Sequence, residues 1–200
     1  MGKIFCIMGK SSSGKDTLYQ LLLKKEELHL SRVIPYTTRP RRRLEEEGRE
    51  YFFVDEARQK RMEEEGKIIE LRSYDTVHGI WKYFTADDGQ ICLEKNNYII
   101  IATLEAYEKM LLFFGKGVMV PIYVEVEDGI RLQRALDREK LQDQPKYAEL
   151  CRRFLADTED FSEEKLLHAN IKKRFYNETL ENTCQEIGAY IKSQICPAMS

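Results

Sequence analysis

Three continuous apolar runs stand out along the chain, at residues 4–8, 98–102 and 118–124. Successive positions in these runs are apolar, instead of alternate ones, and this pattern is typical of strands covered by helices on both faces. Helix-forming stretches separate the runs. Strands that alternate with helices in this way predict an α/β fold with a central, doubly wound parallel sheet.

Shorter patterns complete the expected set of elements. An Asp at position 55 is a suitable helix N-cap, and Gly66 is a suitable stop. Helices are expected over residues 18–23, 55–65, a stretch ending near 115, 131–140, 147–158 and 179–195. Short strands are expected over residues 33–36, 51–54, 67–71 and 79–84.

Composition narrows the class of protein. A chain of 200 residues with 42% hydrophobic content can bury one core, so we expect a single domain. Its 32 basic and 34 acidic side chains nearly cancel, which argues against a nucleic-acid binder. Apolar runs fall short of the roughly 20 residues that span a bilayer, and residues 3–8 are too few for a signal peptide. We expect no membrane association.

The cysteines favour a reducing compartment. The five are scattered without a C-x-x-C pair and without a histidine at metal-ligand spacing. Free thiols in an odd number fit a cytoplasmic protein, which is the expected location.

The strongest chemical signal is the segment Gly9–Lys15, which fits G-x-x-x-x-G-K between a predicted strand and a predicted helix. Successive backbone N–H groups of such a loop surround phosphate oxygens, and the positive end of the following helix faces the same anion. Lys15 is expected to reach the β- and γ-phosphates of ATP. The residues assigned to ATP are Gly9, Ser11, Ser12, Ser13, Gly14, Lys15, Asp16 and Thr17.

The motif departs from its usual form at the magnesium position, where Asp16 replaces the expected Ser or Thr and Thr17 follows. Asp16 is a hard oxygen ligand, and we assign Mg²⁺ to it. There are three alternatives: Thr17 binds the Mg²⁺, another carboxylate such as Glu105 binds it, or the affinity for Mg²⁺ is weak.

A second motif lies in residues 36–55, which are rich in arginine and glutamate. This segment resembles the signature of guanylate kinases, in which T-T-R is followed by a second arginine, an acidic residue, a glycine and Y-x-F. The positions that match at fixed spacing are Arg39, Arg42, Glu45, Gly48 and Tyr51. The resemblance implies that Arg39, Arg42 and Tyr51 hold the phosphate of an acceptor monophosphate, a role that suits guanidinium and phenol donors.

The resemblance continues into the base pocket with departures. Glu70 matches the family carboxylate that accepts hydrogen bonds from guanine. The V-H-G at 77–79 matches the family, but the family's next residues, N-Y-Y-G-T, are not reproduced in this chain. After a small shift of the alignment, Tyr83 is assigned to the acceptor phosphate and Thr85 to the base. His78 is expected to be structural. A family serine aligns with Pro35, and acidic family residues align with 102–103, which leaves the acceptor base open.

The last third of the chain matches the family's lid. Arg134 and Arg138 fit its R-x-x-x-R helix, Arg152 or Arg153 fits its next arginine, and 175–177 fits its late strand ending in Asn. Arginines on a lid close over transferring phosphates. The resemblance implies catalytic roles for Lys15, Arg39, Arg134 and Arg153, and ATP contacts for Arg138.

Taken over the whole chain, the resemblance implies a P-loop fold of three layers. The expected parts are a core at about 1–34, 90–130 and 165–200, a mixed monophosphate-binding insertion at about 35–89, and a helical lid at about 131–162. The implied function is ATP- and Mg²⁺-dependent phosphorylation of a nucleoside monophosphate, GMP to GDP first, in purine nucleotide metabolism, by a monomer or homodimer. A kinase of altered acceptor choice and a non-catalytic protein-binding module remain alternatives.

Overall fold

A parallel sheet of five strands forms the centre of the computed structural model, which describes residues 1–76 and 79–195. Its strands are β1 (Ile4–Met8), β2 (Leu30–Arg32), β7 (Asn97–Ile101), β8 (Met119–Glu125) and β9 (Arg174–Tyr176), in the order β2-β7-β1-β8-β9. All four neighbouring pairs are parallel. The predicted α/β fold with a central parallel sheet is confirmed.

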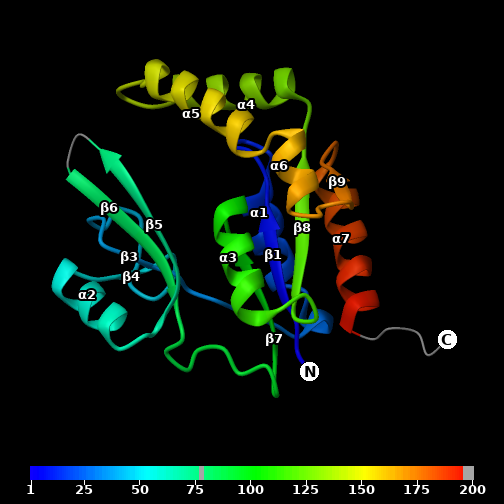
Figure 1. Cartoon of the computed structure of the whole chain (residues 1–200). Coiled ribbons are helices and arrows are strands. Elements are labelled where there is room, and N and C mark those ends of the chain that lie inside the picture. Colours follow the sequence, from blue (N-terminus) through cyan, green and yellow to red (C-terminus); the bar gives the residue numbers. More distant parts are fainter. Residues whose placement is uncertain (77–78, 196–200) are drawn as a thin grey trace.

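Helices cover both faces of this sheet, as the continuous apolar runs predicted (Figure 1). Phe5 and Ile7 of β1 face the cluster formed with α1 (Lys15–Leu23) and α7 (Leu180–Ile195). Cys6 and Met8 face the opposite cluster, which includes α3 (Leu104–Phe114) and α6 (Glu163–His168). Alternate side chains of one strand therefore enter two separate cores, and this arrangement requires apolar residues at every position.

A smaller mixed sheet lies beside the core, on the left in Figure 1. It contains β3 (Tyr36–Thr37), β4 (Phe52–Phe53), β5 (Ile68–Thr76) and β6 (Gly79–Ala86), in the order β4-β3-β6-β5. The helix α2 (Glu56–Glu64) begins at Asp55, whose side chain accepts the Arg58 N–H at 2.7 Å, as predicted for an N-cap. A small cluster of its own, including Tyr36 and Phe84, holds this part together.

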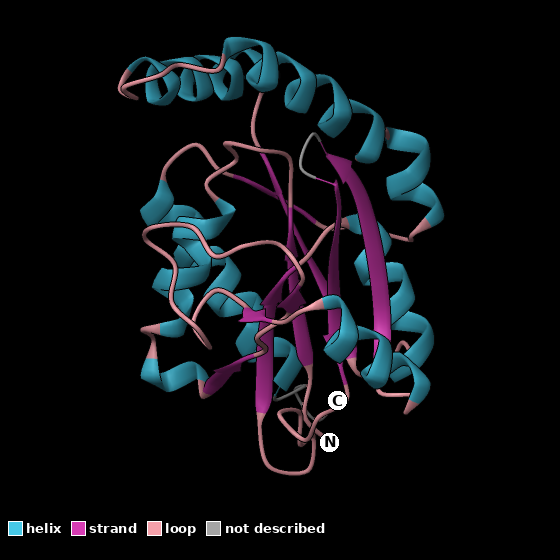
Figure 2. Cartoon of the chain, turned by 90° about the vertical axis from the view of Figure 1, so that its left-hand side faces the viewer, coloured by secondary structure: helices cyan, strands magenta, loops and turns pink. Residues whose placement is uncertain are grey.

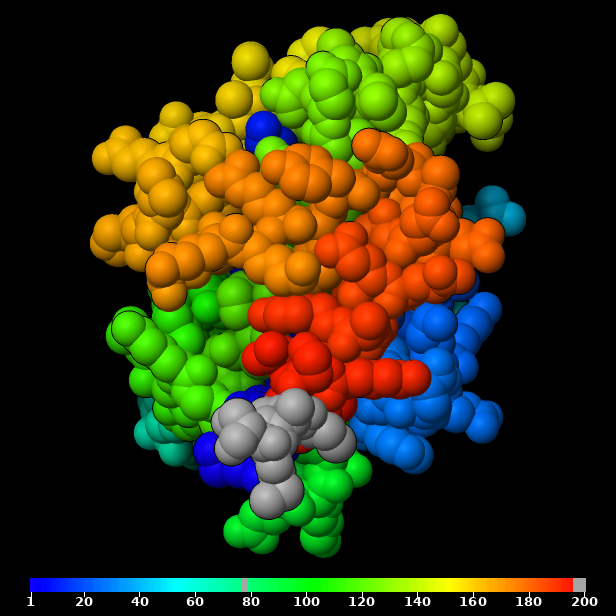
Figure 3. Space-filling view, turned by 90° about the vertical axis from the view of Figure 1, so that its right-hand side faces the viewer, coloured from blue at the N-terminus to red at the C-terminus, as the bar shows by residue number. Residues whose placement is uncertain are grey.

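Two long helices, α4 (Asp128–Lys140) and α5 (Tyr147–Asp160), run along the end of the molecule opposite the N-terminus (Figures 1 and 2). In the space-filling view they cap the top of the molecule, well away from the C-terminal end of α7 (Figure 3). A short 3-10 helix (Glu26–Leu28) joins α1 to β2. Within the described residues, no helix combines the length and the apolar character needed to cross a membrane.

Some expected element bounds were wrong in detail. The second strand was expected at 33–36, but β2 ends at Arg32 and β3 begins at Tyr36. Pro35 has no N–H for a sheet ladder, and the Ile34 N–H is bonded to the Gln90 side chain at 2.8 Å instead. The helix expected from 131 begins earlier, at Asp128, because the Glu127 carboxylate caps it by accepting the Ile130 N–H at 2.9 Å.

Candidate functional site

The loop Gly9–Lys15 joins β1 to α1 at the end of the sheet that α4 and α5 cover. Gly14 adopts a left-handed conformation with φ 85°, and a Cβ there would lie 2.4 Å from the amide nitrogen of Asn177. A Cβ on Gly9 would lie 2.4 Å from the carbonyl oxygen of Val124. Both glycines of the motif are therefore required by close packing.

The body of the protein holds this loop in shape. Asn177 Nδ2 donates to the Ser13 carbonyl oxygen at 2.7 Å, and Ser13 is fully buried. The first N–H groups of α1 have no partner inside the helix, because no earlier turn supplies carbonyls for them. These donors, with the Lys15 ammonium beside them, fit a polyphosphate.

The helices α4 and α5 contact the loop directly. Arg131 on α4 is 1% exposed, and its guanidinium carbon lies 4.3 Å from the centroid of the Phe154 ring. Its Nη1 donates a hydrogen bond to the Ser11 carbonyl oxygen at 3.2 Å. The Asp157 carboxylate on α5 lies 3.3 Å from Arg131 Nη1 and accepts the Ser11 N–H at 2.8 Å. Arg138 Nη2 donates to the Ser12 hydroxyl at 3.2 Å. Ser11 is thus held by α4 and α5 together, and Ser12 is held by α4.

We expect Arg131→Met to lower the free energy of unfolding by about 3 kcal/mol, because it leaves the Asp157 carboxylate without its buried partner. Arg152→Met is the matched control. Arg152 is an exposed arginine on α5 that pairs with Glu149 at 2.8 Å, and such pairs contribute about 0–1 kcal/mol. Urea unfolding followed by circular dichroism measures both variants. Equal, small losses would show that the buried arrangement around Arg131 contributes little.

Arg39 lies buried in the mixed sheet, 3% exposed. Its Nη1 and Nη2 donate to the two carboxylate oxygens of Glu45 at 2.8 and 2.7 Å, and its Nε donates to the Tyr83 hydroxyl at 3.1 Å. The hydrogen bond from Arg39 holds the pKa of Glu45 below its usual range. The guanidinium also lies over the ring of Tyr51, 5.3 Å from its centroid. Arg39, Tyr51 and Tyr83 thus form one group.

Arg42, by contrast, has an exposed side chain. Its backbone N–H donates to the same Glu45 carboxylate at 2.8 Å, so it belongs to the loop that surrounds Arg39. Burial raises the pKa of the Tyr51 phenol, which keeps it a neutral hydrogen-bond donor near pH 7.

Glu70 is enclosed, with a side chain that is 0% exposed. Its two oxygens accept Arg72 Nε at 2.9 Å, Arg72 Nη2 at 3.2 Å and the Thr85 hydroxyl at 2.9 Å. Arg72 Nη1 donates in turn to the Thr103 hydroxyl at 3.3 Å. This buried carboxylate is therefore paired with a guanidinium and hydrogen-bonded inside the protein, as a buried charge requires.

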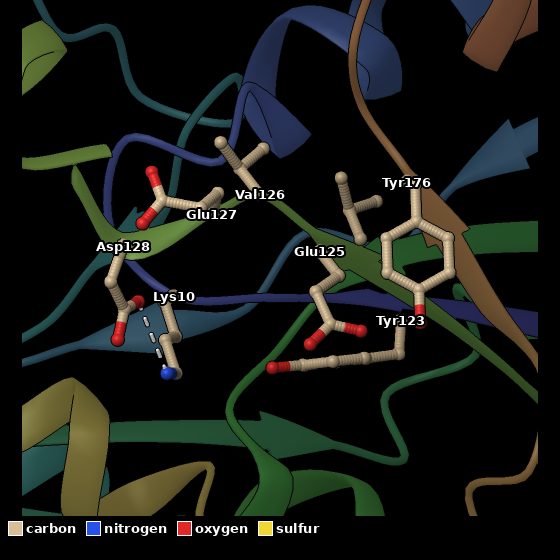
Figure 4. A pocket seen from close by; sticks show the side chains of 8 residues that line it. Lys10, Tyr123, Glu125, Val126, Glu127, Asp128 and Tyr176 are labelled. Atoms are coloured by element: carbon tan, nitrogen blue, oxygen red, sulfur yellow. Dashed lines mark hydrogen bonds and ion pairs between the residues drawn. The ribbon is translucent and has the colours of Figure 1, made fainter. Parts of the chain in front are cut away.

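A cavity of about 230 Å³ lies beside the loop, between Lys10 and the carboxyl end of β8 (Figure 4). Lys10 pairs with Asp128 at 3.3 Å across one side, while Glu125 and Tyr123 point toward it from β8. Its other lining residues are Val124, Val126, Glu127 and Tyr176. Three carboxylates disfavour an anion here, so a polyphosphate fits the N–H groups of the loop better than this cavity.

Comparisons with known proteins agree with this geometry. The family model "Guanylate kinase" matches residues 1–80, which contain the loop Gly9–Lys15, the arginine segment and Glu70. A guanylate kinase of Caldanaerobacter subterraneus is 28% identical over 200 aligned positions, covering 98% of this chain and 89% of that protein. The chain is thus similar to guanylate kinases, most clearly over residues 1–80.

Two further relatives complete the comparison. A guanylate kinase of Nitrosomonas europaea is 40% identical over 79 residues, which are 40% of this chain and only 37% of that protein. The crystal structure of guanylate kinase from Anaplasma phagocytophilum superposes with a TM-score of 0.64 at 21% identity, covering 96% of this chain and 86% of that one. The predicted fold is thereby confirmed, and the predicted resemblance to guanylate kinases is found in both sequence and structure.

Some residues that were predicted for the site have exposed side chains. Arg134 is exposed on α4. Arg153 is 55% exposed and pairs with Glu149 at 3.2 Å. Asp16, the predicted magnesium ligand, is 77% exposed and lies 3.5 Å from Lys15 Nζ. Among the described residues, no cluster of three or more His, Cys, Asp or Glu side chains has the arrangement of a metal site. His78 lies outside the described residues.

Sequence analysis of the family motif missed three residues that the site contains. Arg131 and Asp157 were read only as parts of charged helices, and nothing in the sequence pairs them. Arg72 had a usable signal, because it lies two positions after Glu70 on one strand and so shares its face.

Proposed function

We propose that this chain transfers the γ-phosphoryl group of ATP to a nucleoside monophosphate, with GMP as the first acceptor. The observation that carries the proposal is the presence in one fold of two groups whose chemistry fits a phosphate. One is the loop Gly9–Lys15 with its ammonium, and the other is the buried Arg39 group of the mixed sheet. A kinase needs both, one for the donor and one for the acceptor.

On the donor side, the loop N–H groups hold the β- and γ-phosphates and Lys15 neutralises charge that develops during transfer. Mg²⁺ bound with the nucleotide supplies further charge neutralisation. Asp16 and Thr17 are the chain's oxygen donors for it at the start of α1. Arg138 already contacts Ser12, and the exposed Arg134 and Arg153 reach the phosphates only if α4 and α5 move as a lid.

On the acceptor side, Arg39, Arg42, Tyr51 and Tyr83 bind the monophosphate, and the mixed sheet serves as the acceptor-binding part. Glu45 occupies the fork of Arg39, so the acceptor phosphate has to share or displace that carboxylate. Catalysis then comes from alignment and charge neutralisation, without a covalent intermediate. A cytoplasmic monomer or homodimer remains part of this proposal.

A non-catalytic protein-binding module is the second candidate. The closed pairs Arg39–Glu45 and Arg72–Glu70 favour it, because each satisfies a charged group that a nucleotide would otherwise use. Lys15 and the glycines of the loop favour the kinase, since a module that does not bind ATP has no physical need for them.

The test is ADP formation from ATP and Mg²⁺ with GMP, AMP, CMP, UMP and dTMP offered in turn. Turnover with a monophosphate supports the kinase, and GMP is expected to be used best. No turnover with any acceptor, together with no rise in melting temperature on adding ATP and Mg²⁺, would support the binding module. A ligand present at 100 times its Kd stabilises the native state by about 2.7 kcal/mol, so binding is measurable without turnover.

A further inference from the structure

We propose that Arg72 is the residue that reads the acceptor base, and that the acceptors are 6-oxopurine nucleoside monophosphates irrespective of their substituent at position 2. GMP and IMP then serve alike. This inference rests on the proposed function and names the substrate class of the same site.

The first observation is that Glu70 is closed off from an incoming base. Its side chain is 0% exposed, and three donors from Arg72 and Thr85 already lie on its two oxygens. A base that used Glu70 would have to displace Arg72 or Thr85 from a buried charge, and hydrogen bonds to charged groups are stronger than those between neutral groups. The group next to a ligand is therefore the guanidinium that covers Glu70, whose side chain remains 12% exposed.

The second observation is that Arg72 and the Arg39 group lie on one face of the mixed sheet. Arg72 and Tyr83 are paired across β5 and β6, so their side chains project from the same face. The Tyr83 hydroxyl accepts the Arg39 Nε–H, and the Tyr83 ring lies 5.6 Å from Tyr74 and 5.7 Å from Tyr51. A continuous surface therefore extends from the Arg39 guanidinium to the Arg72 guanidinium across these tyrosine rings.

A nucleotide fits this surface in one direction. Its phosphate belongs on Arg39, its planar base on the tyrosine rings, and the edge of that base at Arg72. Tyr74 lies two positions after Arg72 on β5, on the same face, and because it is 42% exposed its ring is open to an incoming base.

The chemistry of Arg72 selects the edge that it reads. Guanidinium has only donors, and it pairs with the adjacent O6 and N7 acceptors of guanine, which hypoxanthine shares. Adenine presents an amino donor in place of O6 and is disfavoured. The 2-amino group meets no free carboxylate on Glu70, so its presence or absence changes little.

The experiment compares kcat/KM of the wild-type chain for GMP, IMP, 7-deaza-GMP and AMP. We expect IMP to lie within about tenfold of GMP, and 7-deaza-GMP to be at least about tenfold poorer because one hydrogen bond to a charged donor is lost. AMP should also be at least about tenfold poorer. A preference for GMP over IMP above about a hundred-fold, or 7-deaza-GMP used as well as GMP, would overturn the inference while leaving the kinase proposal intact.

Turnover with none of these acceptors would contradict the kinase proposal. In that case calorimetric Kd values for GMP, IMP and 7-deaza-GMP decide the present inference alone: equal binding of the first two with weaker binding of the third supports it, and any other order, or no binding, overturns it.

Arg72→Gln gives an independent test, with Arg61→Gln, at an exposed arginine of α2, as control. If Arg72 reads the base, the ratio of kcat/KM for GMP to that for 7-deaza-GMP falls to about one in Arg72→Gln and is unchanged in Arg61→Gln. If Arg72 only supports Glu70, both substrates lose activity equally and the ratio stays as in the wild type. Should Arg72→Gln fail to fold, the analogue series on the wild-type chain still decides.

Discussion

Lys15→Ala is expected to lower kcat at least about a thousand-fold, while the fold is retained. The Lys15 side chain is 18% exposed at the end of the loop, close to Asp16. In the proposed mechanism its ammonium lies beside the transferring phosphoryl group, and an arginine finger, another charge stabiliser of phosphoryl transfer, contributes about 10³–10⁵ in kcat. ADP formation at saturating ATP and acceptor measures the effect.

Lys24→Ala is the matched control, because Lys24 is an exposed lysine just after the same helix. It should keep wild-type turnover, and both variants should show the wild-type melting temperature within experimental error. If Lys15→Ala turned over at the wild-type rate, the loop would not be the catalytic phosphate site and the kinase proposal would fail.

Burial on both faces explains why the core strands could be predicted from the sequence. The runs at β1, β7 and β8 are apolar at every position because their side chains enter two helical layers in turn. The strand β5 was expected to end at 71 but continues to Thr76. Its second half, residues 72–76, is mostly polar and projects beyond the core, so hydrophobic periodicity gives it little signal.

The loop and the arginine group were predictable because their chemistry depends on residues close together in the sequence. Arg39 and Glu45 are six positions apart and lie in one motif. The contacts of Arg131 with Asp157 and of Asp157 with Ser11 join segments far apart in the chain. Such pairs depend on how α4 and α5 cross the loop, and a single sequence contains no measure of that crossing.

The state of Glu70 shows a different limit. Its position was identified from the family motif, but the motif does not include Arg72, the neighbour that forms an ion pair with it. Arg72 neutralises it from the same strand face, and Thr85 completes its hydrogen bonds. A matching residue type at a matching position therefore does not establish a matching role, because the role depends on which partners remain free.

Arg39→Ala is expected to lower kcat/KM for the acceptor several hundred-fold and to change the KM for ATP little. The guanidinium is 3% exposed and now donates to Glu45, and an acceptor phosphate that takes over this fork gains two paired donors. Loss of two charge-assisted hydrogen bonds at about 1.5–3 kcal/mol each accounts for an effect of this size. Initial rates over a grid of ATP and acceptor concentrations separate the two constants.

Two further variants separate the geometry of the Arg39 side chain from its positive charge. Arg39→Lys keeps the charge but not the paired geometry, so it should recover only part of the lost kcat/KM. Arg43→Ala removes an exposed arginine of the same loop and should behave as the wild type. If Arg39→Ala weakened ATP and the acceptor equally, Arg39 would act at the donor or at a shared position, and the mixed sheet would lose its assignment as the acceptor site. If Arg43→Ala reproduced the full effect, the general positive charge of the loop would be responsible, and the buried geometry of Arg39 would not.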